Sequence, residues 1–330
     1  NVRKQSHKSL NIIEIAVPLC SSQSHVFTFR KDLALYFHEK IIKKYTFQFW
    51  FFFVFILAVG MITTAWCAES ADLIRNKKPD TIRIALVHLN SQPGEVTLNR
   101  SRIEAAINEA VLKKADWILT PELAETGYGF VKKIGTNWIE NFPNDWIRRL
   151  SGMARISGVT LFIGLAEKDS TTGKLHNSVA VIGRDGVIHG TYRKHRVIKG
   201  PAERWATPGQ ENNLFIIDGI PVGLLICADS YKAEVAIRHK LQGARILLSP
   251  ANWPQSGHMG PKNYWETRTQ ETGLPLIVNN RTGREPDLDF TTGESTLVIS
   301  GHRVFKFKSD DTKIFYLDWK VKKNSFAIVP

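Results

Sequence analysis

The chain has 330 residues, nine tryptophans and a hydrophobic share of 43%, which is enough apolar material for a complete core. Its formal net charge is +13 at pH 7. Residues 1–79 hold 11 basic and 5 acidic side chains, which leaves 33 basic and 26 acidic side chains, or +7, for the rest. The sequence has no arginine run with interleaved aromatic residues and no single-faced basic helix, so we expect no nucleic-acid partner.

An uncharged apolar run of 14 residues, Phe49–Ile62, stands in the first quarter of the chain. Three lysines precede it, Lys40, Lys43 and Lys44, and small or polar residues follow it. This order of basic, apolar and small residues is typical of a signal peptide. The run is shorter than the about 20 residues that a membrane span needs. We therefore predict that residues 46–68 form a signal peptide, with an uncleaved membrane anchor as the alternative.

Two further expectations depend on this segment. We assign no fold and no function to residues 1–45, because the first methionine is Met61, inside the apolar run. Whether those residues are native stays open. A signal peptide predicts an exported protein, periplasmic or extracellular, or one anchored to a membrane by residues 46–68. A membrane partner is expected only through this segment, if it is not cleaved.

Residues 80–330 are expected to form one domain, because about 250 residues fit a single core and no long linker or internal repeat interrupts them. Strand-like apolar runs alternate there with amphipathic helical segments. In chain order the expected elements are 81–90, 99–114, 116–121, 143–157, 159–166, 177–189, 213–227, 233–243, 245–249, 262–272, 275–280 and 295–308. This mixed pattern predicts an α/β layered fold.

Three residues of chemical interest each follow or close a strand-like segment. Glu122 ends one apolar run, Lys194 follows a hairpin-like stretch, and Cys227 closes another apolar run. Taken singly, such residues are more often solvated charges or small buried hydrophobic side chains. Loops at the ends of a sheet often carry chemistry, so the three together predict one site with an acid, an amine and a thiol.

The segments around these residues resemble those of a known family. Thr120–Glu122, Tyr192–Lys194 and Leu225–Asp229, in that order, are similar to the signature segments of the nitrilase superfamily of carbon–nitrogen hydrolases. The similarity runs from about Thr81 to about Lys320. It implies a four-layer αββα sandwich and an enzyme that needs no metal and no other cofactor. It also implies a small-molecule amide substrate and assembly into a homodimer or a larger homo-oligomer.

The same resemblance implies a Glu-Lys-Cys catalytic triad. Cys227 would attack the substrate carbonyl as a thiolate, Glu122 would transfer the proton, and Lys194 would stabilise the oxyanion. Glu203 would bond the lysine or help to place the substrate. The residues expected in supporting or substrate-binding roles are Glu203, Tyr128, Ala228, Asp229 and Trp253.

One position departs from the family pattern. Ala228 follows Cys227, where members of the family usually carry an aromatic residue. The continuation Cys227–Asp229 favours amides over nitriles. We therefore expect an exported thiol hydrolase that cleaves the non-peptide C–N bond of a linear amide through a thioester intermediate. The alternatives are an N-acyltransferase that passes the acyl group to an amine, and a catalytically weak binding module.

Sequencing the amino-terminus of the fractionated protein tests the export prediction. The domain after about Ala68 should cross the membrane, and a cleaved protein should begin between about Thr64 and Ser70. Recovery of an intact chain from the cytosol, residues 1–40 included, would contradict export without bearing on the catalytic residues.

Overall fold

The computed structural model describes residues 79–211, 213–254 and 261–329. The head at residues 1–45 and the apolar segment at residues 46–68 lie outside the described residues. Within the described ranges, no helix combines the length and the apolar character that a membrane crossing requires.

The first sheet consists of seven strands: β1 (Thr81–His88), β2 (Trp117–Leu119), β3 (Thr160–Lys168), β4 (Leu175–Ile182), β5 (Ile188–Arg193), β14 (Lys313–Lys320) and β15 (Ser325–Val329). Their order across the sheet is β15-β14-β1-β2-β3-β4-β5. The central strands β1, β2 and β3 run parallel, whereas β14 pairs antiparallel with the whole length of β1. β14, near the end of the described residues, therefore closes onto β1, the first described strand.

The second sheet consists of six strands: β6 (Phe215–Ile217), β7 (Ile220–Leu224), β8 (Ile246–Pro250), β9 (Leu276–Asn279), β12 (Ser295–Ile299) and β13 (His302–Phe307). Their order is β13-β12-β9-β8-β7-β6, and β7, β8 and β9 run parallel. Each sheet thus has a parallel centre, and the loops that leave the carboxyl ends of those strands gather at one edge.

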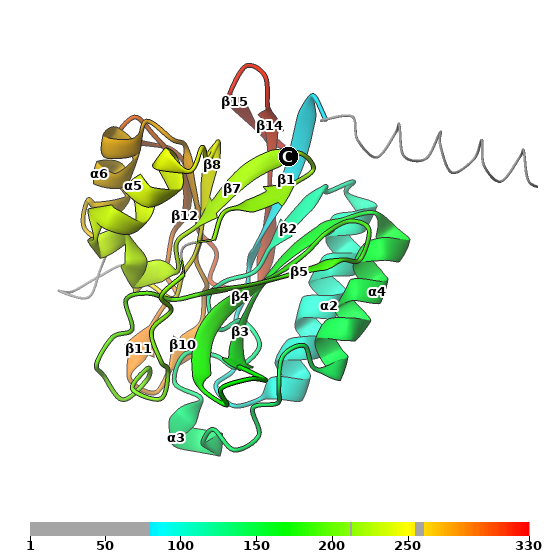
Figure 1. The fold of residues 1–330 in the computed structure, drawn as a ribbon, viewed down its shortest axis with the longest axis vertical. Coiled ribbons are helices and arrows are strands. Elements are labelled where there is room, and N and C mark those ends of the chain that lie inside the picture. Colours follow the sequence, from blue (N-terminus) through cyan, green and yellow to red (C-terminus); the bar gives the residue numbers. More distant parts are fainter. Residues whose placement is uncertain (1–78, 212, 255–260, 330) are drawn as a thin grey trace, which may run out of the picture. The chain divides into compact units, whose positions relative to one another are not determined.

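Four helices cover the outer faces of the two sheets: α2 (Val96–Leu112), α4 (Asp145–Ser157), α5 (Ala233–Leu241) and α6 (Tyr264–Thr272). Ile103 and Ile107, one turn apart on α2, pack in one cluster with Val87 of β1. Ile84 and Leu86 point to the opposite face of β1, into the core between the sheets. Figure 1 shows α2 and α4 on one side and α5 and α6 on the other. The predicted four-layer αββα sandwich is confirmed.

Short elements stand in the loops between these layers: α3 (Val131–Ile134), the 3-10 helix η1 (Cys227–Tyr231), and a small two-stranded sheet of β10 (Arg284–Glu285) and β11 (Leu288–Asp289). The loop after β2 leads to α3, the loop after β7 leads to η1, and the loop after β9 leads to β10. α3, η1 and β10 therefore each follow a parallel strand of one of the two sheets.

The helix predicted over residues 99–114 begins earlier than expected. α2 starts at Val96, and Asn99 is buried within its first turn. The Asn99 side chain accepts a hydrogen bond from the backbone nitrogen of Gln92 (2.8 Å) and donates one to the backbone oxygen of Glu125 (3.1 Å). Asparagine often caps the start of a helix, but here the Asn99 side chain joins the loop before α2 to the loop after β2.

The strand predicted over residues 213–227 is a hairpin followed by a loop. Asp218 and Gly219 form the two-residue turn between β6 and β7 with φ angles of 51° and 72°, as a type I′ turn requires. β7 ends at Leu224, so Cys227 stands at the start of η1 and not on the strand.

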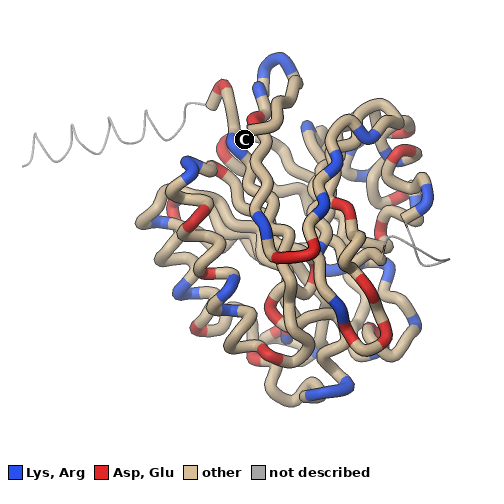
Figure 2. The backbone as a smooth tube through the Cα atoms, turned by 180° about the vertical axis from the view of Figure 1, so that it is seen from behind, with Lys and Arg blue, Asp and Glu red and all other residues tan. Residues whose placement is uncertain are grey.

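Basic and acidic side chains are interspersed along the described backbone (Figure 2). Some pairs join neighbouring elements: Arg149 of α4 lies 2.8 Å from Glu104 of α2, and Arg83 of β1 lies 2.8 Å from Asp318 of β14. Such exposed or half-exposed pairs contribute about 1 kcal/mol or less each. The two apolar clusters that flank the first sheet therefore supply most of the stability of the fold.

Gly164 of β3 provides a test of the packing. A Cβ atom there would lie 2.0 Å from the backbone oxygen of Pro121, next to Glu122. Gly164→Ala should therefore lower the free energy of unfolding by about 1–3 kcal/mol, the usual range for overpacking. The measurement is chemical denaturation of the purified protein.

Gly152 of α4 is the matched control, because a Cβ atom there would meet no atom within 4 Å. Gly152→Ala should raise the free energy of unfolding by about 0.5–1 kcal/mol, since alanine favours a helix more than glycine does. A destabilisation of the same size in both variants would contradict this packing.

Candidate active site

Lys194 lies at the centre of a buried cluster of charged side chains. It follows β5, and its Nζ lies 2.6 Å from Oε1 of Glu122 and 2.5 Å from Oε1 of Glu203. All three side chains are fully buried. A buried ammonium group is tolerated only with such partners. The structure thus brings together the predicted amine and both predicted acids.

Glu122 follows β2 and is held by residues from both sheets. Nδ2 of Asn177, on β4, donates to Oε1 (2.7 Å), and the backbone nitrogen of Asn252, after β8, donates to Oε2 (2.9 Å). Nδ2 of Asn252 also donates to the backbone oxygen of Glu122 (2.8 Å). Burial raises the pKa of Glu122 above its usual value of 4.5, although Lys194 opposes this shift. The carboxylate is therefore fixed in position and is a stronger base than an exposed glutamate.

The two acids keep Lys194 charged. Burial alone lowers the pKa of Lys194, but the charges of Glu122 and Glu203 outweigh it and hold that pKa well above 10.5. Glu203 is itself fixed by the backbone nitrogen of Ile198, which donates to Oε2 (2.8 Å). The ammonium group fills the place between the carboxylates where a cation would bind. Among the described residues, no three side chains gather as the ligands of a metal ion would.

Cys227 begins η1 with a φ angle of 46°, a left-handed conformation that residues other than glycine rarely adopt. Its side chain is buried, with an exposed fraction of 6%. Burial, together with the nearby charge of Glu122, raises the pKa of the thiol well above 9.0. The resting thiol is therefore protonated at neutral pH, and it becomes a strong nucleophile only when a base removes the proton.

Asp229 joins the cysteine turn to the lysine segment. Oδ2 accepts hydrogen bonds from the backbone nitrogen of Ile226 (2.9 Å) and the hydroxyl group of Tyr192 (2.9 Å). Oδ1 accepts from the backbone nitrogens of His195 (3.0 Å) and Arg196 (2.7 Å). Its oxygens thus bind the two chain segments that flank the cluster, which is a supporting arrangement.

The other predicted residues lie around the cluster. Tyr128 is buried, and this burial and the nearby Glu203 raise the pKa of its hydroxyl group well above 10.0. Trp253 is buried too, and its ring packs edge-on against Tyr231 (5.3 Å between centroids) and Trp265 (5.2 Å). Ala228 is buried within η1. Tyr128 is thus the one of these three with a polar group in the electrostatic field of the cluster.

Asn177 and Asn252 are site residues that the sequence analysis missed. Asn252 stands next to the predicted Trp253, directly after β8, so its place at a strand end was an available signal. Asn177 lies within β4, and nothing in its sequence neighbourhood distinguishes it from the other residues of that strand. Only the order of the strands in the first sheet, where β3 alone separates β4 from β2, brings it to Glu122.

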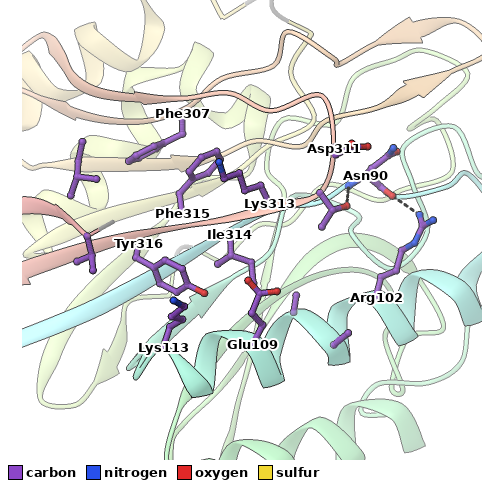
Figure 3. A pocket seen from close by; sticks show the side chains of 15 residues that line it. Asn90, Arg102, Glu109, Lys113, Phe307, Asp311, Lys313, Ile314, Phe315 and Tyr316 are labelled. Atoms are coloured by element: carbon purple, nitrogen blue, oxygen red, sulfur yellow. Dashed lines mark hydrogen bonds between the residues drawn. The ribbon is translucent and has the colours of Figure 1, made fainter.

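One hollow, about 840 Å³ in volume, lies between α2 and β14. Figure 3 shows Glu109 of α2 and Lys113, which follows that helix, near Ile314 and Tyr316 of β14, whereas Arg102 of α2 lies beside Asn90. None of the described residues that line it belongs to the charged cluster or carries a thiol. Size alone therefore does not identify the site.

A second hollow, about 650 Å³ in volume, is lined by Tyr128 and Glu203. We name it the Tyr128 hollow. Both residues also border the cluster around Lys194. This hollow is therefore the one that adjoins the predicted catalytic residues.

Comparisons with known proteins identify the family. A family model described as carbon-nitrogen hydrolase matches residues 83–316. A nitrilase of Pyrococcus abyssi is 30% identical over 234 residues, which cover 69% of this chain and 86% of that protein. An N-carbamoylputrescine amidase of Arabidopsis thaliana is 29% identical over 208 residues, which cover 58% of this chain and 68% of that protein.

Solved structures show the same fold. A carbon-nitrogen hydrolase from Helicobacter pylori aligns with a TM-score of 0.63 at 26% identity, covering 75% of this chain and 92% of that one. An amidase from Nesterenkonia sp. AN1, solved with the acetamide moiety of fluoroacetamide added covalently at its active-site cysteine, aligns with a TM-score of 0.64 at 22% identity, covering 74% and 92%. With the family match over most of the described residues, the chain belongs to the carbon–nitrogen hydrolase family.

Proposed function

We propose that the protein hydrolyses a linear, non-peptide amide, with Cys227 as the nucleophile and Glu122 and Lys194 as its catalytic partners. The observation that carries the proposal is the buried contact between Nζ of Lys194 and Glu122 (2.6 Å), whose charges act directly on the thiol. Membership of the family supports cleavage of a carbon–nitrogen bond.

The first step is removal of the thiol proton. A carboxylate offers about four acceptor positions. At Glu122, three of them are used by Asn177, Lys194 and the backbone of Asn252. The remaining position can accept the proton of Cys227 as the sulfur attacks. Because the pKa of that thiol is high at rest, proton transfer and attack on the substrate are expected to occur together.

The second step is acylation. The sulfur of Cys227 bonds to the carbonyl carbon, and the carbonyl oxygen becomes an oxyanion to which Lys194 donates a hydrogen bond. Glu122 then passes its proton to the nitrogen, the C–N bond breaks, and the amine leaves. The acyl group remains on the sulfur as a thioester.

The third step is hydrolysis of the thioester. A water molecule attacks the carbonyl carbon, and Glu122 accepts a proton from it. Lys194 stabilises the second oxyanion as it did the first. The C–S bond breaks, the carboxylic acid leaves, and the proton returns to Cys227. Glu203 contributes the second negative charge beside Lys194, which holds the ammonium group in place throughout the cycle.

Amides are favoured over nitriles on two grounds. Ala228 follows the cysteine, where family members usually carry an aromatic residue. Several similar proteins are named as amidases, including an omega-amidase of Xenopus tropicalis that is 28% identical over 246 residues. Incubation with a panel of linear amides, with and without an added amine, separates hydrolysis from acyl transfer. Release of the free acid supports hydrolysis, and formation of a new amide supports transfer.

Substitution of the nucleophile tests the proposal directly. Cys227→Ser should abolish amide hydrolysis without changing the melting temperature, because a hydroxyl group ionises far less readily than a thiol. In the unchanged protein, iodoacetamide should label Cys227, as read from the mass of its peptide. Full amidase activity in Cys227→Ala would refute the mechanism.

The supporting charges provide a second test. Lys194→Ala should lower kcat by at least about a hundredfold, as loss of an oxyanion donor does in other hydrolases. Glu122→Gln should lower kcat by about the same factor or more, because proton transfer is lost in both half-reactions.

Glu125→Gln is the matched control for these variants. Glu125 is another buried acid of the same loop, and it pairs with Arg100 at 2.6 Å. Its substitution removes a similarly buried carboxylate but should leave kcat within about twofold, since acids outside the reacting groups contribute little to the barrier. Near-normal rates in both Lys194→Ala and Glu122→Gln would exclude the proposed triad.

A further inference from the structure

The small hairpin of β10 and β11 holds the loop that carries Tyr128. Oε1 of Glu285 accepts a hydrogen bond from the backbone nitrogen of Tyr128 (2.8 Å), and Oε2 accepts one from the backbone nitrogen of Gly129 (2.7 Å). One carboxylate thus binds two consecutive peptide groups, and charged acceptors form the stronger kind of hydrogen bond. Glu285 therefore fixes the backbone at Tyr128.

Arg281 holds that carboxylate in place. The guanidinium group is fully buried and forms an ion pair with Glu285. Nη2 donates to the backbone oxygen of Ser91 (2.5 Å), Nε donates to that of Thr282 (3.1 Å), and the group lies 4.6 Å from the centre of the Phe290 ring. The position of Glu285 is therefore set by a buried cation that is itself held on several sides.

The held loop has little room to move. A Cβ atom on Gly129 would lie 2.9 Å from Oε2 of Glu285. Gly127 has a φ angle of 70°, and a Cβ atom there would lie 2.8 Å from Cα of Pro93. The two glycines on either side of Tyr128 allow this close approach of the loop to its neighbours.

Tyr128 lines the Tyr128 hollow together with Glu203, which contacts Lys194 in the catalytic cluster. The charges of Glu203 and Lys194, and the thiol of Cys227, all act on the hydroxyl group of Tyr128. The apolar or largely apolar members of that lining are Pro93, Tyr128, Ile198, Pro201, Ala202, Pro286 and Leu288, and each charged member of the lining forms an ion pair with another side chain. Such a lining suits a hydrocarbon or aromatic group better than a charged one.

We propose that Glu285, held by Arg281, is a positioning residue that fixes Tyr128 as a wall of the Tyr128 hollow beside the catalytic cluster, so that the site selects amides with an apolar substituent. A purely structural ion pair would stabilise the fold without influencing which substrates are accepted. The part of this inference that concerns amides depends on the proposed function, and the part that concerns access to Cys227 does not.

Alkylation of Cys227 tests the inference without requiring turnover. Iodoacetamide and iodoacetanilide deliver the same reactive carbon, but the second carries a phenyl group that needs the hollow. In Glu285→Gln, the ratio of the Cys227 alkylation rates, iodoacetanilide over iodoacetamide, should fall by at least about threefold, a modest loss for an apolar pocket. The rates are read from the mass of the Cys227 peptide, so the other cysteines do not interfere.

Glu285→Asp keeps the charge beside Arg281 but draws the carboxylate away from the two backbone nitrogens. It should lower the same ratio even if Glu285→Gln does not fold. Glu125→Gln is the matched control, because it breaks a buried Glu–Arg pair of the same loop without touching Tyr128. It should change the melting temperature and leave the ratio within about 1.5-fold.

A double-mutant cycle identifies Tyr128 as the route of the effect. In a Tyr128→Ala background the wall is already gone, so Glu285→Asp should change the alkylation ratio by less than about 1.5-fold. If Glu285→Asp lowers the ratio equally in both backgrounds, or lowers it no more than Glu125→Gln does, Glu285 does not act through Tyr128 and the inference is overturned.

Turnover of acetamide and hexanamide separates this inference from the proposed function. Glu285→Asp should lower the kcat/KM of hexanamide relative to that of acetamide by at least about threefold, mainly through KM, since the reacting groups are unchanged. If the unchanged protein hydrolyses neither amide while the alkylation ratio shifts as expected, the positioning role stands and amide hydrolysis does not. If hydrolysis proceeds and both ratios stay constant, amide hydrolysis stands and the positioning role of Glu285 does not.

Discussion

The buried contact of Lys194 with Glu122 and Glu203 is the interaction on which the rest of the site depends. Burying such charges costs several kcal/mol per ion unless their partners are placed closely. The cluster holds one more negative than positive charge. That excess adds to the burial of Cys227 in keeping its thiol protonated. The thiol therefore loses its proton only as it attacks an electrophile that takes up the electron density released.

The packing of the two sheets determines the geometry of the cluster. Glu122 follows a strand of the first sheet, and Asn252 follows a strand of the second. The backbone nitrogen of Asn252 donates a hydrogen bond to the carboxylate of Glu122. A second hydrogen bond joins the two sheets: Nδ2 of Asn279, at the end of β9, donates to the backbone oxygen of Leu119, at the end of β2 (2.6 Å). The apolar core between the sheets holds these strand ends at a fixed spacing, because closely packed interiors resist small displacements. A substitution in that core would therefore shift the carboxylate of Glu122 relative to the residues that orient it.

The sequence predicts those parts of the structure that depend on local pattern. The alternation of apolar runs and the strand-end positions of Glu122 and Lys194 predict the layers and the charged cluster. The role of Asn177 could not be predicted, because a polar residue within a strand acquires its partner only when β4 takes its place in the sheet. The pairing of β14 with β1 joins residues more than 200 positions apart, and no local signal specifies it. The break after β7 was missed because an apolar run continues to Cys227 although the strand ends at Leu224.

Four buried acids at or beside the site divide into two kinds by what their oxygens contact. Glu122 and Glu203 contact an ammonium group, whereas Asp229 and Glu285 each accept hydrogen bonds from at least two backbone nitrogens of loops beside the site. Loops at strand ends lack a neighbouring strand to satisfy those nitrogens, and a buried nitrogen without an acceptor is costly. A carboxylate supplies two oxygens that can serve two such groups at once. The loops that carry the chemistry are thus made rigid by acids that take no part in it, and a list of acidic residues in the sequence cannot separate the two kinds.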